Sequence, residues 1–389
     1  MEKFYEDIRN FSPLEPLHKN GEVIGIKFKK TGVLPLDLYK QVLLGNTYNG
    51  LVFQTINNTP NKISFKKAIA DLEESDEWKN KLWSINNCQN VVDLFYDSCK
   101  APNTPETKSM KHDVAQQLFF MRNWFKYKQI YKFDEDFFDF IKNEDANEKI
   151  PTEILKTSLP CSAFFIDNTF KAGKFESDGC FVCFNEENYS DGDEISLSFY
   201  FNGKTFDGKE TDVFQYGNIP LDLGNKSVNE LLNNDPVPNA LLPDNDNLRC
   251  EVNDLIAQAL KCVIYMCASN KEVEVRKGRT GKEQYDVKQQ MKKASQIGVN
   301  LKQDEVGVRI GNTIRQNRIV YEKNKDAVHH TGTPKSPHLR SGHYHSFWIG
   351  KKDGSEERKI ILKFIPPLFI GKGKEMDVTV HKVEGMELE

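Results

Sequence analysis

A short stretch near the C-terminus gathers side chains that can bind ligands or move protons. Residues 337–350 read PHLRSGHYHSFWIG and hold three histidines, one arginine and three aromatic residues. Imidazole titrates near neutral pH and can ligate a metal, while guanidinium binds phosphate or carboxylate through paired hydrogen bonds. The candidate binding residues, with no role assigned, are His338, Arg340, Gly342, His343, Tyr344, His345, Trp348 and, from the next segment, Lys363.

Two β-strands, joined by a loop that contains Asp353 and Gly354, are predicted to position these side chains. Residues on a strand point alternately to its two faces. The first strand, 343–350, therefore places His343, His345, Phe347 and Ile349 on one face and Tyr344, Ser346 and Trp348 on the other. The partner strand covers about 357–365 and ends at two prolines, because proline cannot donate to a ladder.

Three interpretations of this stretch stay open. In the first, His343 and His345 bind a metal with His338, but Arg340 lies between them and the motif holds no carboxylate. In the second, His338, Arg340, His343 and Tyr344 form a patch that faces phosphate or RNA. In the third, the same side chains are structural residues of a small sheet. We expect neither a metal nor a cofactor.

Paired histidines also suit metal-free cleavage of RNA, in which one imidazole acts as acid and another as base. Such an enzyme needs a cation beside the reacting phosphate. Arg340 and Lys363 are the candidates for that cation. A ribonuclease, or a passive RNA-binding module, is therefore the alternative function, although the leading expectation is a protein without enzymatic activity.

The chain as a whole predicts an α+β fold, in which a helix-rich N-terminal region precedes a mixed α/β region that ends in a basic β-hairpin. Residues 63–100 have a helical pattern, and Val114, Leu118 and Met121 recur at helical spacing. Runs rich in aromatic residues and bounded by Gly, Asn and Asp predict strands. These strands cover 162–167, 180–185 and 194–203, and a buried helix covers 248–267.

Changes in composition divide the chain into four predicted segments. They are an N-terminal region without identified relatives (1–110), a helical segment (111–150), an α+β core (151–270) and a basic C-terminal region (271–389). Residues 270–303 are polar and lack clear periodicity, which predicts an irregular excursion. No GxxxxGK[ST] or GxGxxG loop occurs, so nucleotide hydrolysis is not expected.

Charge is unevenly distributed along the chain. Residues 271–389 carry 24 Lys and Arg against 16 Asp and Glu, a net charge of +8. The remaining residues carry 29 basic against 41 acidic side chains, a net charge of −12. Six of the eight histidines also lie in the basic part. This asymmetry favours an anionic partner for the C-terminal region.

Neither export nor membrane insertion is expected. The first residues, MEKFYEDIRNFSPLEP, lack the basic and apolar regions of a signal peptide. The longest apolar stretch, 255–268, is too short to span a bilayer. The eight cysteines should accordingly stay reduced. Cys180 and Cys183 stand without a second CxxC, so we expect buried apolar residues rather than a zinc or redox pair.

The C-terminal motif resembles a family signature. PHLRSGHYHSFWIG followed by KIILKFIPPLFI is similar to a pattern, roughly P-H-x-R-x-G-H-W-x-x-x-W-x-G and then an apolar strand, found in proteins of phages and other bacterial mobile elements. The family includes the type V-A anti-CRISPR protein that acts on the expression of the effector nuclease. Weaker matches keep the same order upstream, so the resemblance covers about 112–373.

This resemblance implies a specific way of acting. It implies recognition of the N-terminal polypeptide of a CRISPR effector nuclease as it emerges from the ribosome, followed by loss of the encoding mRNA. The implied partners are that target polypeptide and RNA or the ribosome, in the cytoplasm of a bacterial host. Tyr344 stands where the family has tryptophan, and Ser341 where a second basic residue is common. The identity of the target does not transfer.

Overall fold

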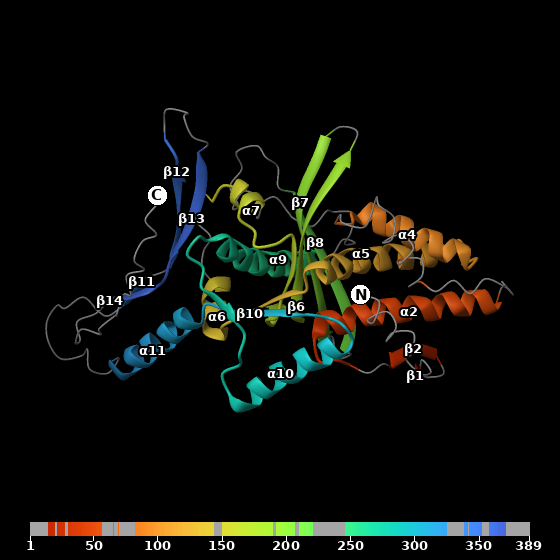
Figure 1. Cartoon of the computed structure of the whole chain (residues 1–389), viewed down its shortest axis with the longest axis horizontal. Coiled ribbons are helices and arrows are strands. Elements are labelled where there is room, and N and C mark those ends of the chain that lie inside the picture. The colour runs from red at the N-terminus through yellow and green to blue at the C-terminus, as the bar shows by residue number, and fades with distance from the viewer. Residues whose placement is uncertain are drawn as a thin grey trace.

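The computed structural model describes residues 15–19, 22–27, 30–56, 65, 69, 82–143, 150–189, 192–206, 210–220, 246–324, 338–340, 342–351 and 358–370. The helices and strands in these ranges form an α+β architecture, as predicted (Figure 1). Within the same ranges, no helix has the length and apolar character needed to cross a membrane.

A mixed sheet runs through the centre of the molecule (Figure 1). Its strand order is β8 (Glu210–Pro220), β7 (Gly192–Phe206), β6 (Phe175–Tyr189), β4 (Ala163–Ile166), β3 (Gln129–Phe133), β10 (Lys302–Val306) and β9 (Val273–Val275), with β5 (Phe170–Ala172) paired to β6. β3 runs parallel to both β4 and β10, and the other pairs are antiparallel. The three predicted strands over 162–167, 180–185 and 194–203 are confirmed as β4 and parts of β6 and β7.

The sheet separates two hydrophobic cores, because alternate residues of each strand point to opposite faces. On β3, Tyr131 and Phe133 enter one core and Ile130 enters the other. The first core is covered by α6 (Glu135–Asn143), α7 (Glu153–Thr157) and α9 (Asp246–Cys267). The second is covered by α2 (Leu34–Ile56), α4 (Ile85–Ser98), α5 (Pro105–Tyr127) and one end of α10 (Gly281–Gln296).

The prediction of an irregular excursion over 270–303 is wrong. This segment contains the edge strand β9 and the helix α10. The helix begins at a sequence-encoded cap, since the Thr280 hydroxyl accepts a hydrogen bond from the Glu283 amide at 3.1 Å. Val287 and Ala294 are the helix residues that are buried, two turns apart. Such a narrow apolar stripe leaves no clear periodicity in the sequence.

In the described part of the chain, three two-stranded sheets are separate from the central one: β1–β2 (Glu15–Lys19 and Glu22–Lys27), β11–β14 (His338–Arg340 and Leu368–Ile370) and β12–β13 (His343–Ile349 and Lys359–Ile365). α11 (Val308–Asn324) follows β10. The β12–β13 hairpin lies at the opposite end of the molecule from α2 and α4 (Figure 1). The division into four segments stays a prediction, and the central sheet takes strands from the last three of them.

Candidate functional site

The C-terminal candidate residues lie mainly on the β12–β13 hairpin. The two strands pair antiparallel, with Tyr344 opposite Phe364, His345 opposite Lys363, and Phe347 opposite Ile361. Residues that oppose each other across a ladder share a face. One face of the hairpin, here called the inner face, therefore carries Tyr344, Ser346, Trp348, Ile360, Leu362 and Phe364. The other, the outer face, carries His343, His345, Phe347, Ile349, Lys359, Ile361, Lys363 and Ile365.

The inner face packs on the first core. Ile360, Leu362 and Phe364 are buried there. The Phe364 ring lies 5.8 Å from the ring of Phe137 on α6 and 5.3 Å from that of Tyr265 on α9, with both pairs edge to face. Aromatic pairs prefer this arrangement and gain about 0.5–1.5 kcal/mol beyond the area they bury. The hairpin is thereby fixed to the body by one face, which leaves the other directed to solvent.

Hydrogen bonds to the turn after α9 hold the second edge of β13. The Ser269 amide and hydroxyl both donate to the Leu362 carbonyl, at 2.7 and 3.0 Å. The Asn270 side chain accepts from the Phe364 amide at 2.9 Å and donates to the Phe364 carbonyl at 2.8 Å. β13 is therefore paired on both edges, and the position of the outer face is set by the protein body.

Gly342 has a structural role at the base of the hairpin. It is buried, and a Cβ atom there would lie 3.1 Å from the Ile365 carbonyl oxygen and 3.1 Å from the Phe140 ring. A side chain at this position would therefore push the Ile365 carbonyl and the Phe140 ring away by a few tenths of an ångström. The glycine of the motif therefore serves the packing of the hairpin.

The outer face joins rings and cations. The rings of His345 and Phe347 lie 4.2 Å apart with an interplanar angle of 38°. The Lys363 ammonium lies 5.7 Å from the centre of the Phe347 ring, within cation–π distance. His345, Phe347 and Lys363 are all exposed. This arrangement offers a flat ring surface next to a positive charge.

A second ring and cation pair lies further along the hairpin. Trp348 is 55% exposed, although Ile360, which lies opposite it on the inner face, is buried. The Arg358 guanidinium lies 5.1 Å from the centre of the Trp348 ring. Ile349 is also exposed. Lys351, Arg358, Lys359 and Lys363 place four positive charges on the described part of the hairpin.

The structure thus brings some of the predicted site residues together and separates others. His345 and Lys363 meet on the outer face, while Trp348 lies on the exposed part of the hairpin. Tyr344 is half-buried and packs on Phe364 with a ring distance of 5.1 Å, so it belongs to the inner face. His343 is half-buried opposite Ile365.

Two further candidates are described by their backbone only. His338 pairs with Ile370 and Arg340 with Leu368 in the short β11–β14 ladder. The side chains of both residues, and the loop with Asp353 and Gly354, lie outside the described residues. Their assignment to the site stays a prediction.

Phe347 and Arg358 join the surface although neither was among the candidate residues. The period-two alternation that places His345 on the outer face also places Phe347 there. Arg358 could not be assigned from sequence, since its contact with Trp348 depends on the register of two strands. That register is set by the packing of Leu362 and Phe364.

Metal and redox chemistry find no support among the described residues, where no group of three or more His, Cys, Asp and Glu side chains is placed to hold a metal ion. Cys180 and Cys183 are buried in different cores, because residues three apart on a strand face opposite sides of the sheet. Burial raises the pKa of both thiols well above the ordinary value. The prediction of two structural cysteines is consistent with this placement.

Comparisons with known proteins identify the family. A model described as the anti-CRISPR type V subtype A2 family matches residues 131–372, well over half of the chain. Among solved structures, the crystal structure of AcrVA2 is similar with a TM-score of 0.50 and 15% sequence identity, covering 83% of this chain and 98% of that chain. At this identity the second match supports the fold alone. No curated protein matches. The family match confirms the resemblance seen in the sequence: the chain belongs to the anti-CRISPR type V subtype A2 family.

Proposed function

We propose that this anti-CRISPR protein binds a target polypeptide, as it emerges from the ribosome, and lowers the expression of that target at the level of mRNA or translation. The family supplies the anti-CRISPR function. The observation that supports action on RNA is the outer face of the β12–β13 hairpin, where His345 and Phe347 present rings beside Lys363. The expected partner is a CRISPR effector nuclease, and the site of action is the bacterial cytoplasm.

The chemistry of the hairpin surface suits single-stranded RNA. Bases stack on exposed aromatic and imidazole rings, and the contact tolerates different sequences because every base has a flat face. Phosphates need nearby cations, which Lys363, Lys359 and Arg358 supply. The structural interpretation, in which these rings are core residues, accounts for Tyr344 but not for the exposed Phe347 and Trp348.

Co-expression with a type V-A effector nuclease tests the proposal. The wild-type protein should lower both the mRNA and the protein of the effector, measured by quantitative RT-PCR and immunoblot. The double variant Phe347→Ala/Lys363→Ala should lose the effect, because it removes a ring and a charge from the outer face. As a matched control, Tyr285→Ala/Lys288→Ala removes an exposed aromatic residue and an exposed lysine from α10. That control should act like the wild type.

Two results would contradict parts of this proposal. If wild-type protein changes neither the mRNA nor the protein of any type V-A effector, action on effector expression is wrong. If the hairpin double variant stays fully active while correctly folded, the outer face does not carry the function. Circular dichroism and a thermal melt of each variant establish folding.

The alternative function is a ribonuclease. His343 and His345 both lie on the outer face, and Lys363 lies opposite His345. Two imidazoles and a cation therefore share one surface. Incubation of the purified protein with labelled single-stranded RNA separates the two functions. Shortened RNA that depends on His345 supports the enzyme, while intact but bound RNA supports a binding surface.

A further inference from the structure

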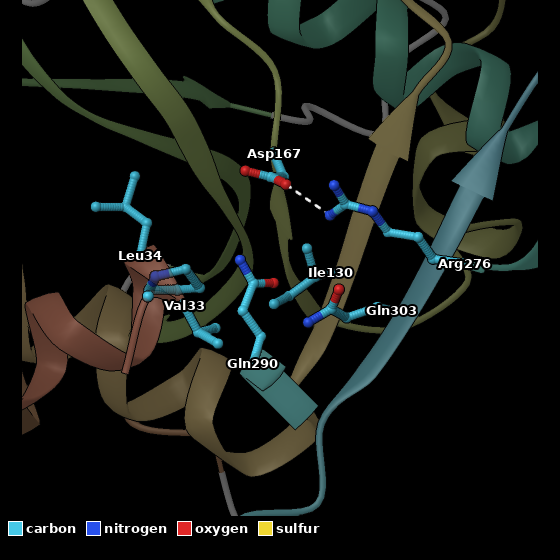
Figure 2. A pocket seen from close by; sticks show the side chains of 9 residues that line it. Val33, Leu34, Ile130, Asp167, Arg276, Gln290 and Gln303 are labelled. Carbon is cyan, nitrogen blue, oxygen red and sulfur yellow. Dashed lines mark hydrogen bonds and ion pairs between the residues drawn. The ribbon is translucent and has the colours of Figure 1, made fainter. Parts of the chain in front are cut away.

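A small cavity on the side of the sheet that faces the second core holds polar atoms without partners. Its volume is about 60 Å³. The lining residues are Gly32, Val33, Leu34, Pro35, Ile130, Asp167, Arg276, Gln290 and Gln303. They come from the start of α2, from β3 and β10, from the ends of β4 and β9, and from α10 (Figure 2). Six separate segments therefore build one site.

Two buried atoms of this cavity lack hydrogen bonds. Among the described residues, neither the Gln303 Oε1 atom nor the Arg276 Nε atom has a partner. Gln303 is only 5% exposed, and Figure 2 shows its amide beside the cavity with that of Gln290. A buried acceptor or donor that stays unpaired costs roughly 1–3 kcal/mol, so such atoms are normally satisfied by water or a ligand.

The two charged residues that line the cavity balance each other; Glu283, whose Oε1 atom lies 3.9 Å from Arg276 Nη2, is outside the lining. Arg276 Nη1 donates to Asp167 Oδ2 at 2.9 Å, so the guanidinium and the carboxylate form an ion pair at one end. A charged ligand would add an unbalanced charge to this partly desolvated space, which is unfavourable. The ligand should therefore be uncharged.

The wall opposite the Arg276–Asp167 ion pair is apolar, and hydrogen bonds fix the turn that leads into it. Val33, Leu34 and Pro35 form this wall, and Ile130, the cross-strand neighbour of Gln303, adds an apolar side chain beside the polar residues. The turn before these residues is fixed by Asp37, whose carboxylate accepts from the amides of Thr31 at 2.7 Å and Gly32 at 3.0 Å. Gly32 has a φ of +81°, a conformation that glycine adopts without strain. The wall is thus formed before any ligand arrives.

We propose that this cavity binds a carboxamide group. A carboxamide places a carbonyl acceptor and an N–H donor on neighbouring atoms, which complements the donor at Arg276 Nε and the acceptor at Gln303 Oε1. A volume of 60 Å³ holds roughly four to six water-sized groups, enough for a carboxamide and its methylenes but too small for a nucleobase. The methylenes would contact the apolar wall. The carboxamide comes either from a free small molecule or from an Asn or Gln side chain of a peptide.

This inference does not depend on the proposed function, and ligand-observed NMR tests it directly. The probes are L-glutamine and the tripeptide Ala-Gln-Ala, compared with L-glutamate and Ala-Glu-Ala. Saturation transfer from the wild-type protein should reach the side-chain methylenes of the glutamine probes. The glutamate probes should bind more weakly by roughly two- to tenfold, the factor for one lost hydrogen bond, because a carboxylate gives no donor to Gln303.

A pair of variants locates the binding. Gln303→Leu removes the acceptor at similar size and should lower glutamine binding to the glutamate level. Gln289→Leu, on the neighbouring position of α10 outside the cavity lining, should leave it unchanged. The comparison of glutamine with glutamate on the wild type stands even if Gln303→Leu fails to fold.

Each outcome has a defined meaning. Binding of both glutamine probes supports a site open to small molecules, and binding of the tripeptide alone supports a site for a peptide side chain. Equal signals for glutamine and glutamate probes, or no signal from any of them, overturn the inference and leave a cavity that holds water only.

Discussion

The side-chain amide of Asn270 makes two hydrogen bonds to the backbone of Phe364, accepting from its amide at 2.9 Å and donating to its carbonyl at 2.8 Å. The same arrangement joins Asn168 to the backbone of Phe133, at 2.8 and 3.0 Å. In both places the asparagine takes the position of a neighbouring strand. Strand edges in this protein are therefore completed by single side chains.

Replacing the more buried of these two asparagines should lower the free energy of unfolding more. Asn168 is 1% exposed, so Asn168→Ala leaves the Phe133 backbone groups unpaired away from water and should cost about 2–4 kcal/mol. Asn270 is exposed, and water can replace it, so Asn270→Ala should cost about 0.5–2 kcal/mol. Urea denaturation measures both. Equal costs for the two variants would refute the role of burial.

Gly311 on α11 is predicted to be intolerant of a side chain. A Cβ atom there would collide with the Asp134 carboxylate, which caps α6 by accepting from the Phe137 amide at 3.1 Å and also binds Arg315. Gly311→Ala should therefore cost about 1–3 kcal/mol through overpacking. The control Gly281→Ala, at the start of α10 with nothing within 4 Å, should be neutral or slightly stabilising. Thermal melts of both variants decide the question.

Alternation and the double proline predicted the two strands of the hairpin closely. The strands lie at 343–349 and 359–365, close to the predicted 343–350 and 357–365, because a period of two and a double proline act locally. The sequence could not show which face packs on the core. That depends on Phe137 and Tyr265, which lie far away in the chain. The candidate site residues therefore combine Tyr344, which lies on the inner face, with His345 and Lys363, which lie on the outer face.

The cavity could not be predicted from the sequence, because it depends on the order of the strands in the sheet. Asp167, Arg276 and Gln303 meet at one cavity only because β4, β3, β10 and β9 are neighbours in that order. Two of these pairs are parallel, and parallel strands need long connections that leave no local signal of pairing. Gln303 lies in a short strand of mostly polar residues, KQDEV, so nothing in the local sequence marks it as a buried side chain at a cavity.

Glu305 should make stability depend on pH. It is 6% exposed on β10, and burial raises the pKa of its carboxyl above the ordinary value, with Arg279 acting in the opposite direction. The folded state then holds the proton more tightly than the unfolded state. The free energy of unfolding should consequently fall as the pH rises from the unfolded-state pKa, about 4.3, through the raised folded-state pKa.

The variant Glu305→Gln isolates this contribution. It should be more stable than the wild type near pH 8, and the difference should shrink as the pH falls toward 4, where Glu305 is mostly protonated in both states. The control Asp286→Asn removes an exposed carboxylate from α10 that is not among the charges acting on Glu305, and it should leave the pH dependence unchanged. Urea denaturation between pH 4 and 8 measures both variants. A constant difference across this range would contradict the prediction.

The hairpin surface should bind single-stranded RNA through stacking and charge in separable ways. Phe347→Ala removes a stacking surface and should weaken binding by about 1–3 kcal/mol at every salt concentration. Lys363→Ala removes a phosphate contact, so it should also flatten the salt dependence, lowering the slope of log K against log salt by about 0.7. Fluorescence anisotropy with a labelled oligonucleotide across a KCl series measures both effects. The control Lys288→Ala removes a charge that is also exposed, on α10. If it changes the slope as much as Lys363→Ala does, the attraction comes from the overall charge of the protein, and the hairpin is not the RNA surface.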